Sequence, residues 1–321
     1  MIDRTALQTE RLREHHRTEH DRRHAHRNRL LDIDPLLDEL GMLDLAETAE
    51  LESAVRGAAR YSQWAVPPPL QRYLACSWTR GVTAGSAGPG EPVLPDGSMD
   101  IIWDGRRLFV AGPDTAPNMT TGDGVDAVGV RFHPGTGPLF LGVPADELCD
   151  RHVELDGLWP ETAEMEDRLA ACSTPRHAAS VLEEHTLRRV PEIREPDAVV
   201  EAASRTWRRG SATADIAHLA EQAGITPRQL HRRFVTAVGY GPKLLQRVLR
   251  LQAFLAACDS PAVGLAELAL RVGYADQAHL SREARILAGR TPSELRTPRL
   301  RVRNVQDPCE QIGYNLTMDP L

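Results

Sequence analysis

Two groups of polar side chains, about fifty residues apart, have the types and spacing needed to read the edges of DNA bases. Arg228, His231 and Arg232 lie at positions i, i+3 and i+4, so a helix would carry them on one face. A second group with helical spacing comprises Gln277, Ala278, Ser281, Arg282 and Arg285. Arginine pairs bidentately with guanine, glutamine pairs with adenine, serine and histidine bond to several base edges, and an alanine methyl can meet a thymine methyl. These eight residues are our candidate DNA contacts.

An internal repeat must position the two groups. Residues 215–242 form a first unit, and residues 264–292 repeat its pattern. The first helix recurs 49 positions later and the second helix 50 positions later, so Arg232 corresponds to Arg282. The difference of one residue falls in the turn, at Ala275, where an insertion is tolerated best. Two matched units, each with an arginine at the same place, favour DNA reading over two solvated polar faces.

Each unit has the pattern of a helix-turn-helix. Thr226 is a good N-cap, followed by Pro227 in the first helical position and by Gln229 three residues after the cap. Asp276 takes the same place in the second unit, and Thr291 begins a closing helix. Residues 242–258 are expected to form one amphipathic helix between the units. The side chains expected to face inward on the two second helices are Leu230, Phe234, Leu280, Ala284 and Leu287.

This region resembles the DNA-binding domain of AraC/XylS-type transcription regulators. The strongest matches are LAELALRVGYADQAHLSR at 265–282 and GRTPSELR at 289–296. The resemblance implies an all-helical domain whose two recognition helices enter successive major grooves, about 34 Å apart. It places base contacts on Arg228, His231, Arg232, Gln277, Ala278, Ser281 and Arg282. The sequence departs from the family at Ala284 and Leu280, where the family often has aromatic residues, so looser packing is expected in the second unit.

The region before the repeat reads as a small β-rich or mixed domain. Apolar runs at 99–103 and 107–111 flank Asp104–Gly105, which predicts a β-hairpin, and 127–132 predicts a third strand. The region resembles a poorly characterised N-terminal domain of AraC-type regulators from high-GC bacteria. That resemblance implies a sensing or dimerising role. The stretches that carry it are WAVPPPLQRYLACSW at 64–78, LPDGSMDIIWDG at 94–105, VGVRFHPG at 128–135 and LGVPADEL at 141–148.

The predicted fold class is α+β, with a β-rich or mixed N-terminal domain and an all-α C-terminal domain of two helix-turn-helix subdomains joined by a long helix. The chain divides into a basic His/Arg-rich arm at 1–30, interpreted as disordered, and a helical lead-in at 31–60. A β-rich sensor or dimerisation domain at 61–160 and a helical connector and linker at 161–194 follow. The DNA-binding domain occupies 195–299 and a tail occupies 300–321.

The charge distribution agrees with this division. Residues 195–299 hold 15 basic and 10 acidic side chains, whereas residues 31–194 hold 13 and 27. A basic module behind an acidic domain is typical of a DNA-binding protein. The net charge of −7 over the whole chain argues against a non-specific nucleoid-type binder.

Composition excludes several other classes. No run reaches eighteen apolar residues and no secretory signal is evident, so we expect a cytoplasmic protein without a membrane partner. Five cysteines without a C-x-x-C motif exclude a disulfide framework and a zinc ribbon. No cofactor and no metal are expected. Double-stranded DNA is the predicted partner. RNA polymerase, a small-molecule effector, and a monomer or homodimer all stay open.

The alternative is a cupin-like small-molecule-binding protein or enzyme in which the helical domain is only an accessory module. Its candidate residues are His133, His152, Glu154, Asp96 and Asp100. The His-x-His and Glu spacing that such sites use is absent, so the prediction is a regulator and not an enzyme. The sequence does not indicate the operator, the effector or the direction of regulation.

Overall fold

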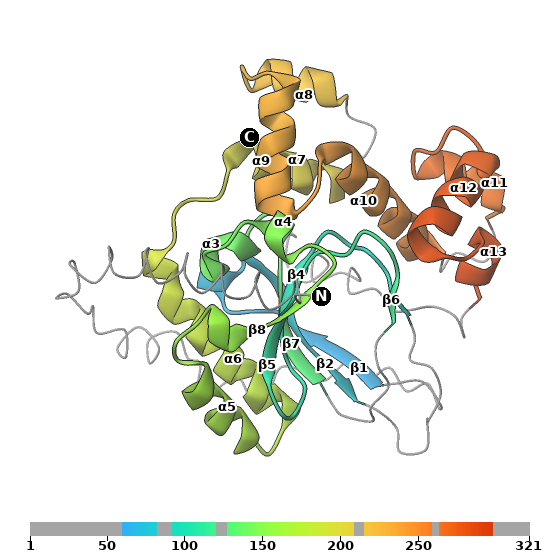
Figure 1. Ribbon diagram of the computed structural model, residues 1–321. Coiled ribbons are helices and arrows are strands. Elements are labelled where there is room, and N and C mark those ends of the chain that lie inside the picture. Colours follow the sequence, from blue (N-terminus) through green and yellow to red (C-terminus); the bar gives the residue numbers. More distant parts are fainter. Residues whose placement is uncertain (1–59, 82–91, 120–126, 209–214, 259–262, 298–321) are drawn as a thin grey trace, which may run out of the picture.

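The computed structural model describes residues 60–81, 92–119, 127–208, 215–258 and 263–297 (Figure 1). The predicted arm and tail lie outside these ranges, and so does the predicted helical lead-in except for its last residue. That residue, Arg60, begins a strand and pairs with Gly81 of the next strand. Within the described ranges, no helix is both long and apolar enough to cross a bilayer.

The N-terminal half is built on a six-stranded antiparallel sheet. Its strands, in spatial order, are β1 (Arg60–Trp64), β2 (Leu74–Gly81), β7 (Ala127–Phe132), β4 (Met99–Trp103), β5 (Leu108–Ala111) and β8 (His152–Glu154). A separate pair is formed by β3 (Pro92–Val93) and β6 (Asn118–Met119). The predicted hairpin is confirmed as β4–β5, where the Asp104 carboxylate accepts from the backbone N–H groups of Arg106 and Arg107. The third predicted strand is β7.

Helices cover one face of this sheet. They are η3 (Pro68–Leu70), α3 (Gly137–Leu141), α4 (Ala145–Leu148), η4 (Leu155–Gly157), α5 (Thr162–Ala170), α6 (Pro175–Arg189) and η5 (Val190–Glu192). We expected residues 161–194 to be a connector, but α6 packs on β2 and β7. Met165 and Leu169, which lie four residues apart on one side of α5, and Leu182 of α6 are buried in the same core as the strands. Glu183 of α6 also accepts a hydrogen bond of 2.5 Å from Ser77 of β2.

The C-terminal half is helical, so the chain is α+β as predicted. Its helices are α7 (Ala198–Thr206), α8 (Ile216–Gln222), α9 (Pro227–Val238), α10 (Pro242–Ala257), α11 (Leu265–Arg271), α12 (Gln277–Ala288) and α13 (Pro292–Leu295). One apolar core joins α7, α8 and α9 to the start of α10, with Trp207 stacked on Phe234 at 5.5 Å. A second core joins the rest of α10 to α11, α12 and α13. The long helix α10 therefore links the two units, as the sequence predicted.

The two halves pack against each other. Gln252 of α10 donates a buried hydrogen bond of 2.6 Å to the carbonyl oxygen of Pro95, and Leu94 is buried in the core of the second unit. Gly97 approaches α10 so closely that a Cβ there would lie 2.7 Å from Cδ1 of Leu245. The helix α4 contacts α9. The sheet domain thus touches both helix-turn-helix units.

Candidate nucleic-acid interface

The first candidate recognition helix is α9, and its local sequence fixes where it begins. The Thr226 hydroxyl accepts from the backbone N–H of Gln229 at 3.2 Å, and Gln229 Oε1 accepts from the backbone N–H of Thr226 at 2.8 Å. This reciprocal pair is the predicted capping box. Leu230 and Phe234 are completely buried, so the opposite face of α9 is turned to solvent.

Arg228, His231 and Arg232 are all exposed on α9, but the structure does not group them equally. Arg228 and Arg232 are one helical turn apart on the outer face. The His231 ring lies against Gly241, where a Cβ would be only 2.6 Å from the ring Nε2. His231 is therefore at the flank of the reading face, next to the start of α10.

The second candidate recognition helix is α12. Its N-cap is Asp276, whose carboxylate accepts from the backbone N–H of His279 at 2.6 Å. Leu280, Ala284 and Leu287 are buried as predicted. The outer face carries the second group of candidates: Gln277, Ala278, Arg282 and Arg285 are exposed, and Ser281 is half-buried. The Ser281 hydroxyl donates to the carbonyl oxygen of Gln277 at 2.8 Å, which leaves it able to accept.

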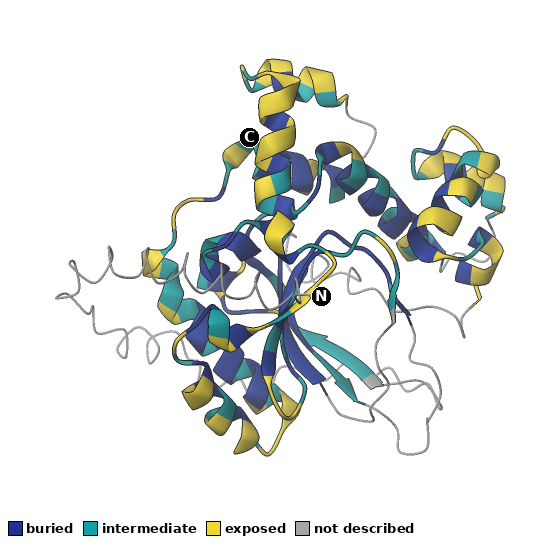
Figure 2. Cartoon of the chain, in the orientation of Figure 1, coloured by how far each residue is buried: buried dark blue, intermediate teal, exposed yellow. Residues whose placement is uncertain are grey.

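The outward arginines differ from their neighbours in electrostatic pairing. Among the described residues, no acidic group forms an ion pair with Arg228, Arg232 or Arg282. By contrast, Arg233 lies 3.6 Å from Asp197 Oδ2, and Arg271 lies 2.6 Å from Glu267 Oε1. Unpaired guanidinium groups on a solvent-facing helix are free to pair with phosphate oxygens or guanine edges. Figure 2 shows the exposed outer sides of α8, α9, α11 and α12.

The sequence analysis did not identify two exposed apolar side chains in the second unit as candidate functional residues. Ile286 is 58% exposed and lies one turn beyond Arg282 on the outer side of α12, and Leu270 of α11 is 60% exposed. The equivalent positions in the first unit hold Thr236 and Glu221. Comparing the two copies of the repeat position by position would have revealed both.

The residues that an enzyme would need are held apart or already paired. Arg131 is only 7% exposed and forms ion pairs with Asp96 at 3.0 Å and Asp100 at 2.9 Å. His152 contacts Asn118, and Glu154 pairs with Arg107 at the edge of the sheet. In the part of the chain that is described, no three His, Cys, Asp or Glu side chains form a group that could hold a metal.

The thiol of Cys149 is not activated as a nucleophile. Burial and the neighbouring carboxylate of Asp150 raise the pKa of Cys149 to about 11. A nucleophilic cysteine needs a lowered pKa, because the thiolate is the reactive form.

The comparisons with known proteins follow the division seen in the structure. Residues 219–298 match the model of a helix-turn-helix domain, and residues 63–154 match the model of a domain of unknown function, DUF6597. The helix-turn-helix match contains all eight candidate DNA contacts. None of the curated proteins matches the sequence.

Solved structures of ToxT from Vibrio cholerae are similar at low sequence identity. A lysine-to-alanine variant of apo ToxT has 10% identity and a TM-score of 0.38, over 69% of this chain and 96% of that chain. Wild-type ToxT with bound unsaturated fatty acid has 9% identity and a TM-score of 0.36, over 65% of this chain and 89% of that chain.

Proposed function

We propose that this chain is a DNA-binding transcription regulator of the AraC type, and that α9 and α12 of its helix-turn-helix domain are the two recognition helices. Each enters the major groove with its N-terminal turns, and the two occupy successive grooves on one side of the duplex. The long helix α10 sets their separation, because it contributes to the apolar cores of both units.

The observation that carries this proposal is the match between the two capped helices. Each begins at a capped residue, buries a leucine four positions after the cap, and presents an unpaired arginine two positions later, at Arg232 and Arg282. A solvated surface has no reason to repeat that arrangement. Arg232 and Arg282 are therefore assigned to base edges, and the exposed N-terminal turns of α9 and α12 to neighbouring phosphates.

The two helices are expected to differ in how strongly they discriminate bases. Arg228 and Arg232 give α9 two long donors on one face. In α12, Ala278 offers only a methyl group, and the Ser281 hydroxyl is already bonded to the helix backbone. The half of the operator read by α12 should therefore tolerate more base changes than the half read by α9.

The sheet domain is assigned a regulatory role, through effector binding or dimerisation. What supports this is its packing against both helix-turn-helix units, which gives it a physical means of changing their arrangement. Light scattering of the full chain and its thermal stability with candidate metabolites test this role. A monomer whose stability no metabolite changes would contradict it.

Selection from a random pool of double-stranded DNA with the full-length chain tests the main proposal. The expected product is a bipartite motif whose two halves have centres about 10 base pairs apart, which is one helical turn. A single uninterrupted motif would contradict reading by two helices. Enrichment of no motif would contradict sequence-specific binding altogether.

A further inference from the structure

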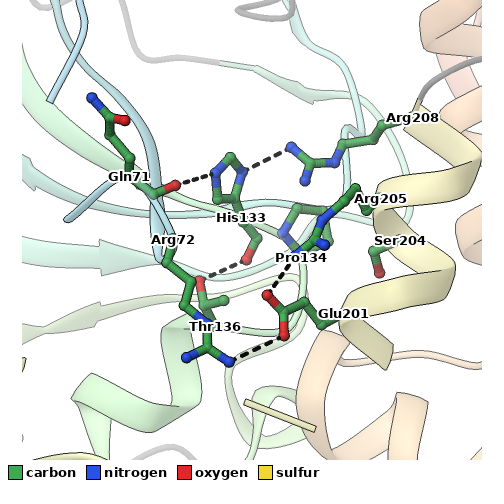
Figure 3. Close-up of a pocket in the computed structure, with 9 residues that line it drawn as sticks. All are labelled: Gln71, Arg72, His133, Pro134, Thr136, Glu201, Ser204, Arg205 and Arg208. Carbon is green, nitrogen blue, oxygen red and sulfur yellow. Dashed lines mark hydrogen bonds and ion pairs between the residues drawn. The ribbon is translucent and has the colours of Figure 1, made fainter. Parts of the chain in front are cut away.

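A pocket lies where the sheet domain meets α7, the helix that leads into the first helix-turn-helix unit. Its volume is about 80 Å³. One wall comes from the residues after η3 and from the turn that follows β7, including Arg72 and His133. The other wall is formed by Glu201, Ser204 and Arg205 of α7 and by Arg208, two residues beyond the end of that helix (Figure 3). A buried water needs roughly 10–15 Å³, so the pocket has room for several waters or one small ligand.

The lining is rich in hydrogen-bond donors. Three arginines and one carboxylate, Glu201, are among the lining residues, and Glu201 lies 2.7 Å from Arg205 and 3.5 Å from Arg72. Arg72 also pairs with Glu195, outside the lining, at 2.6 Å. His133 accepts from Arg208 at Nδ1, at 2.8 Å, and donates from Nε2 to the carbonyl oxygen of Gln71, at 3.2 Å. This pattern holds the imidazole neutral. The lining therefore carries more positive than negative side chains.

Ser204 supplies an independent indication that a ligand belongs here. Its side chain is 2% exposed and lines the pocket, yet its hydroxyl has no hydrogen-bond partner in the described structure. A helical serine can donate to the carbonyl oxygen four residues earlier, as Ser180 and Ser281 do in this chain. A buried hydroxyl without a partner is costly, and a ligand oxygen would satisfy it.

We propose that this pocket binds a small oxyanion, a carboxylate or a phosphate group, held by Arg72, Arg205 and Arg208 and by the hydroxyl of Ser204. Guanidinium groups bind both kinds of oxyanion through paired N–H donors. The size of the pocket restricts the ligand to a small molecule, or to the charged end of a larger one that extends through the open side.

The ligand would bridge the two halves of the protein. Arg72 belongs to the sheet domain, whereas Ser204 and Arg205 belong to α7 and Arg208 lies two residues beyond its end. On its other side, the same helix buries Val200, Ala203 and Trp207 in the core of the first helix-turn-helix unit. An oxyanion that draws α7 toward the sheet therefore acts on the unit that contains α9. This coupling rests on the proposed regulator function, but binding of the oxyanion does not.

Isothermal titration calorimetry of the full-length chain with inorganic phosphate, and separately with acetate, at constant ionic strength tests the site. We expect one binding event with at least one of the two probes, which also shows which chemistry the pocket prefers. Arg205→Gln and Ser204→Ala should each weaken it at least tenfold. Arg188→Gln is the matched control, because Arg188 forms the same kind of ion pair with Glu184, four residues earlier on α6, away from the pocket.

The Ser204→Ala variant distinguishes a hydroxyl that binds the ligand from one that only stabilises the fold. Because the hydroxyl has no partner in the described structure, removing it should leave the urea midpoint unchanged or slightly higher while it weakens oxyanion binding. Binding of neither probe, or equal binding by the wild type and both variants, would overturn the proposal.

DNA binding provides a separate readout. The probe that binds in the calorimetric test should change the Kd for the selected DNA at least threefold in the wild type, at matched ionic strength, and should have no such effect in Arg205→Gln. A Kd that responds equally in both proteins would overturn the coupling. Oxyanion binding without sequence-specific DNA binding would contradict the proposed function alone, and specific DNA binding without oxyanion binding would contradict this inference alone.

Discussion

Gly239 and Gly289 end the two candidate recognition helices at equivalent places in the repeat, and both have positive φ, +97° and +65°. Their surroundings differ. A Cβ on Gly239 would lie 2.6 Å from Cγ of Pro113 and 3.2 Å from the carbonyl oxygen of Ala145, whereas the nearest atom to one on Gly289 is Cγ of Pro117, at 4.0 Å. One short segment of the sheet domain, 113–117, therefore approaches the ends of both helices, and it fits tightly only against α9.

This difference predicts unequal effects of the same substitution. Gly289→Ala should cost about 1–2 kcal/mol, the strain of a left-handed residue that has a Cβ. Gly239→Ala should cost about 1–3 kcal/mol more, because its Cβ also overpacks the contact with the sheet domain. Urea unfolding followed by tryptophan fluorescence measures both losses. Equal losses would show that α9 is not held against the sheet domain.

A second prediction concerns Asp114, which lies in the same segment. Burial, together with the charges of Asp96 and Asp150, raises the pKa of Asp114 to about 7. The folded state therefore holds this proton more tightly than the unfolded state, and stability is lost as the pH rises from about 4 to about 7.

Asp114→Asn should consequently be more stable than the wild type at pH 8, with the advantage shrinking toward pH 5. The unfolding free energy of both proteins at several pH values measures this difference. Asp146→Asn, at an exposed position on α4, is the control. An advantage that does not change with pH would contradict the raised pKa.

The third prediction has the opposite sign and concerns His133. Burial, reinforced by the positive charge of Arg208, lowers the pKa of His133 to about 3. Because the unfolded state binds the proton near the ordinary value of about 6.5, stability is lost as the pH falls below that value. Proton NMR should show the His133 ring neutral at pH 5. Titration of His133 near pH 6.5 would contradict the hydrogen bond from Arg208.

The features that were predicted from the sequence are those that depend on neighbouring residues. Thr226, Asp276 and Thr291 cap helices because each cap acts on backbone groups three residues away or fewer. The turn at Asp104 is equally local. The strand order does not depend on neighbouring residues, because β7 lies between β2 and β4 through pairings that span tens of residues.

Long-range packing also explains why the burial of Glu183 and the pocket beside α7 were not predicted from the sequence. Glu183 is polar and gives no sign in the sequence that it will be buried. It is paired with Ser77 and Arg176, and the first of these lies more than a hundred residues away. The pocket beside α7 has the same origin, since its two walls come from Arg72 and Arg205, which only the docking of the two halves brings together.

The fourth prediction tests base reading directly. Arg232→Ala and Arg282→Ala should each lose about 1–3 kcal/mol of affinity for the selected DNA, about 5- to 150-fold in Kd, and much less for random DNA. Arg233→Ala and Arg271→Ala are the controls, because they remove the same charge from residues that are paired with Asp197 and Glu267.

The most direct measurement is therefore the Kd of the full-length chain for selected and for random DNA at one salt concentration, by fluorescence anisotropy, with and without these substitutions. We expect Arg232→Ala and Arg282→Ala to reduce the ratio of specific to non-specific affinity, while the two controls leave that ratio unchanged. Equal losses on both DNAs would make these arginines phosphate contacts. No loss on either DNA would contradict the assignment of α9 and α12 as recognition helices.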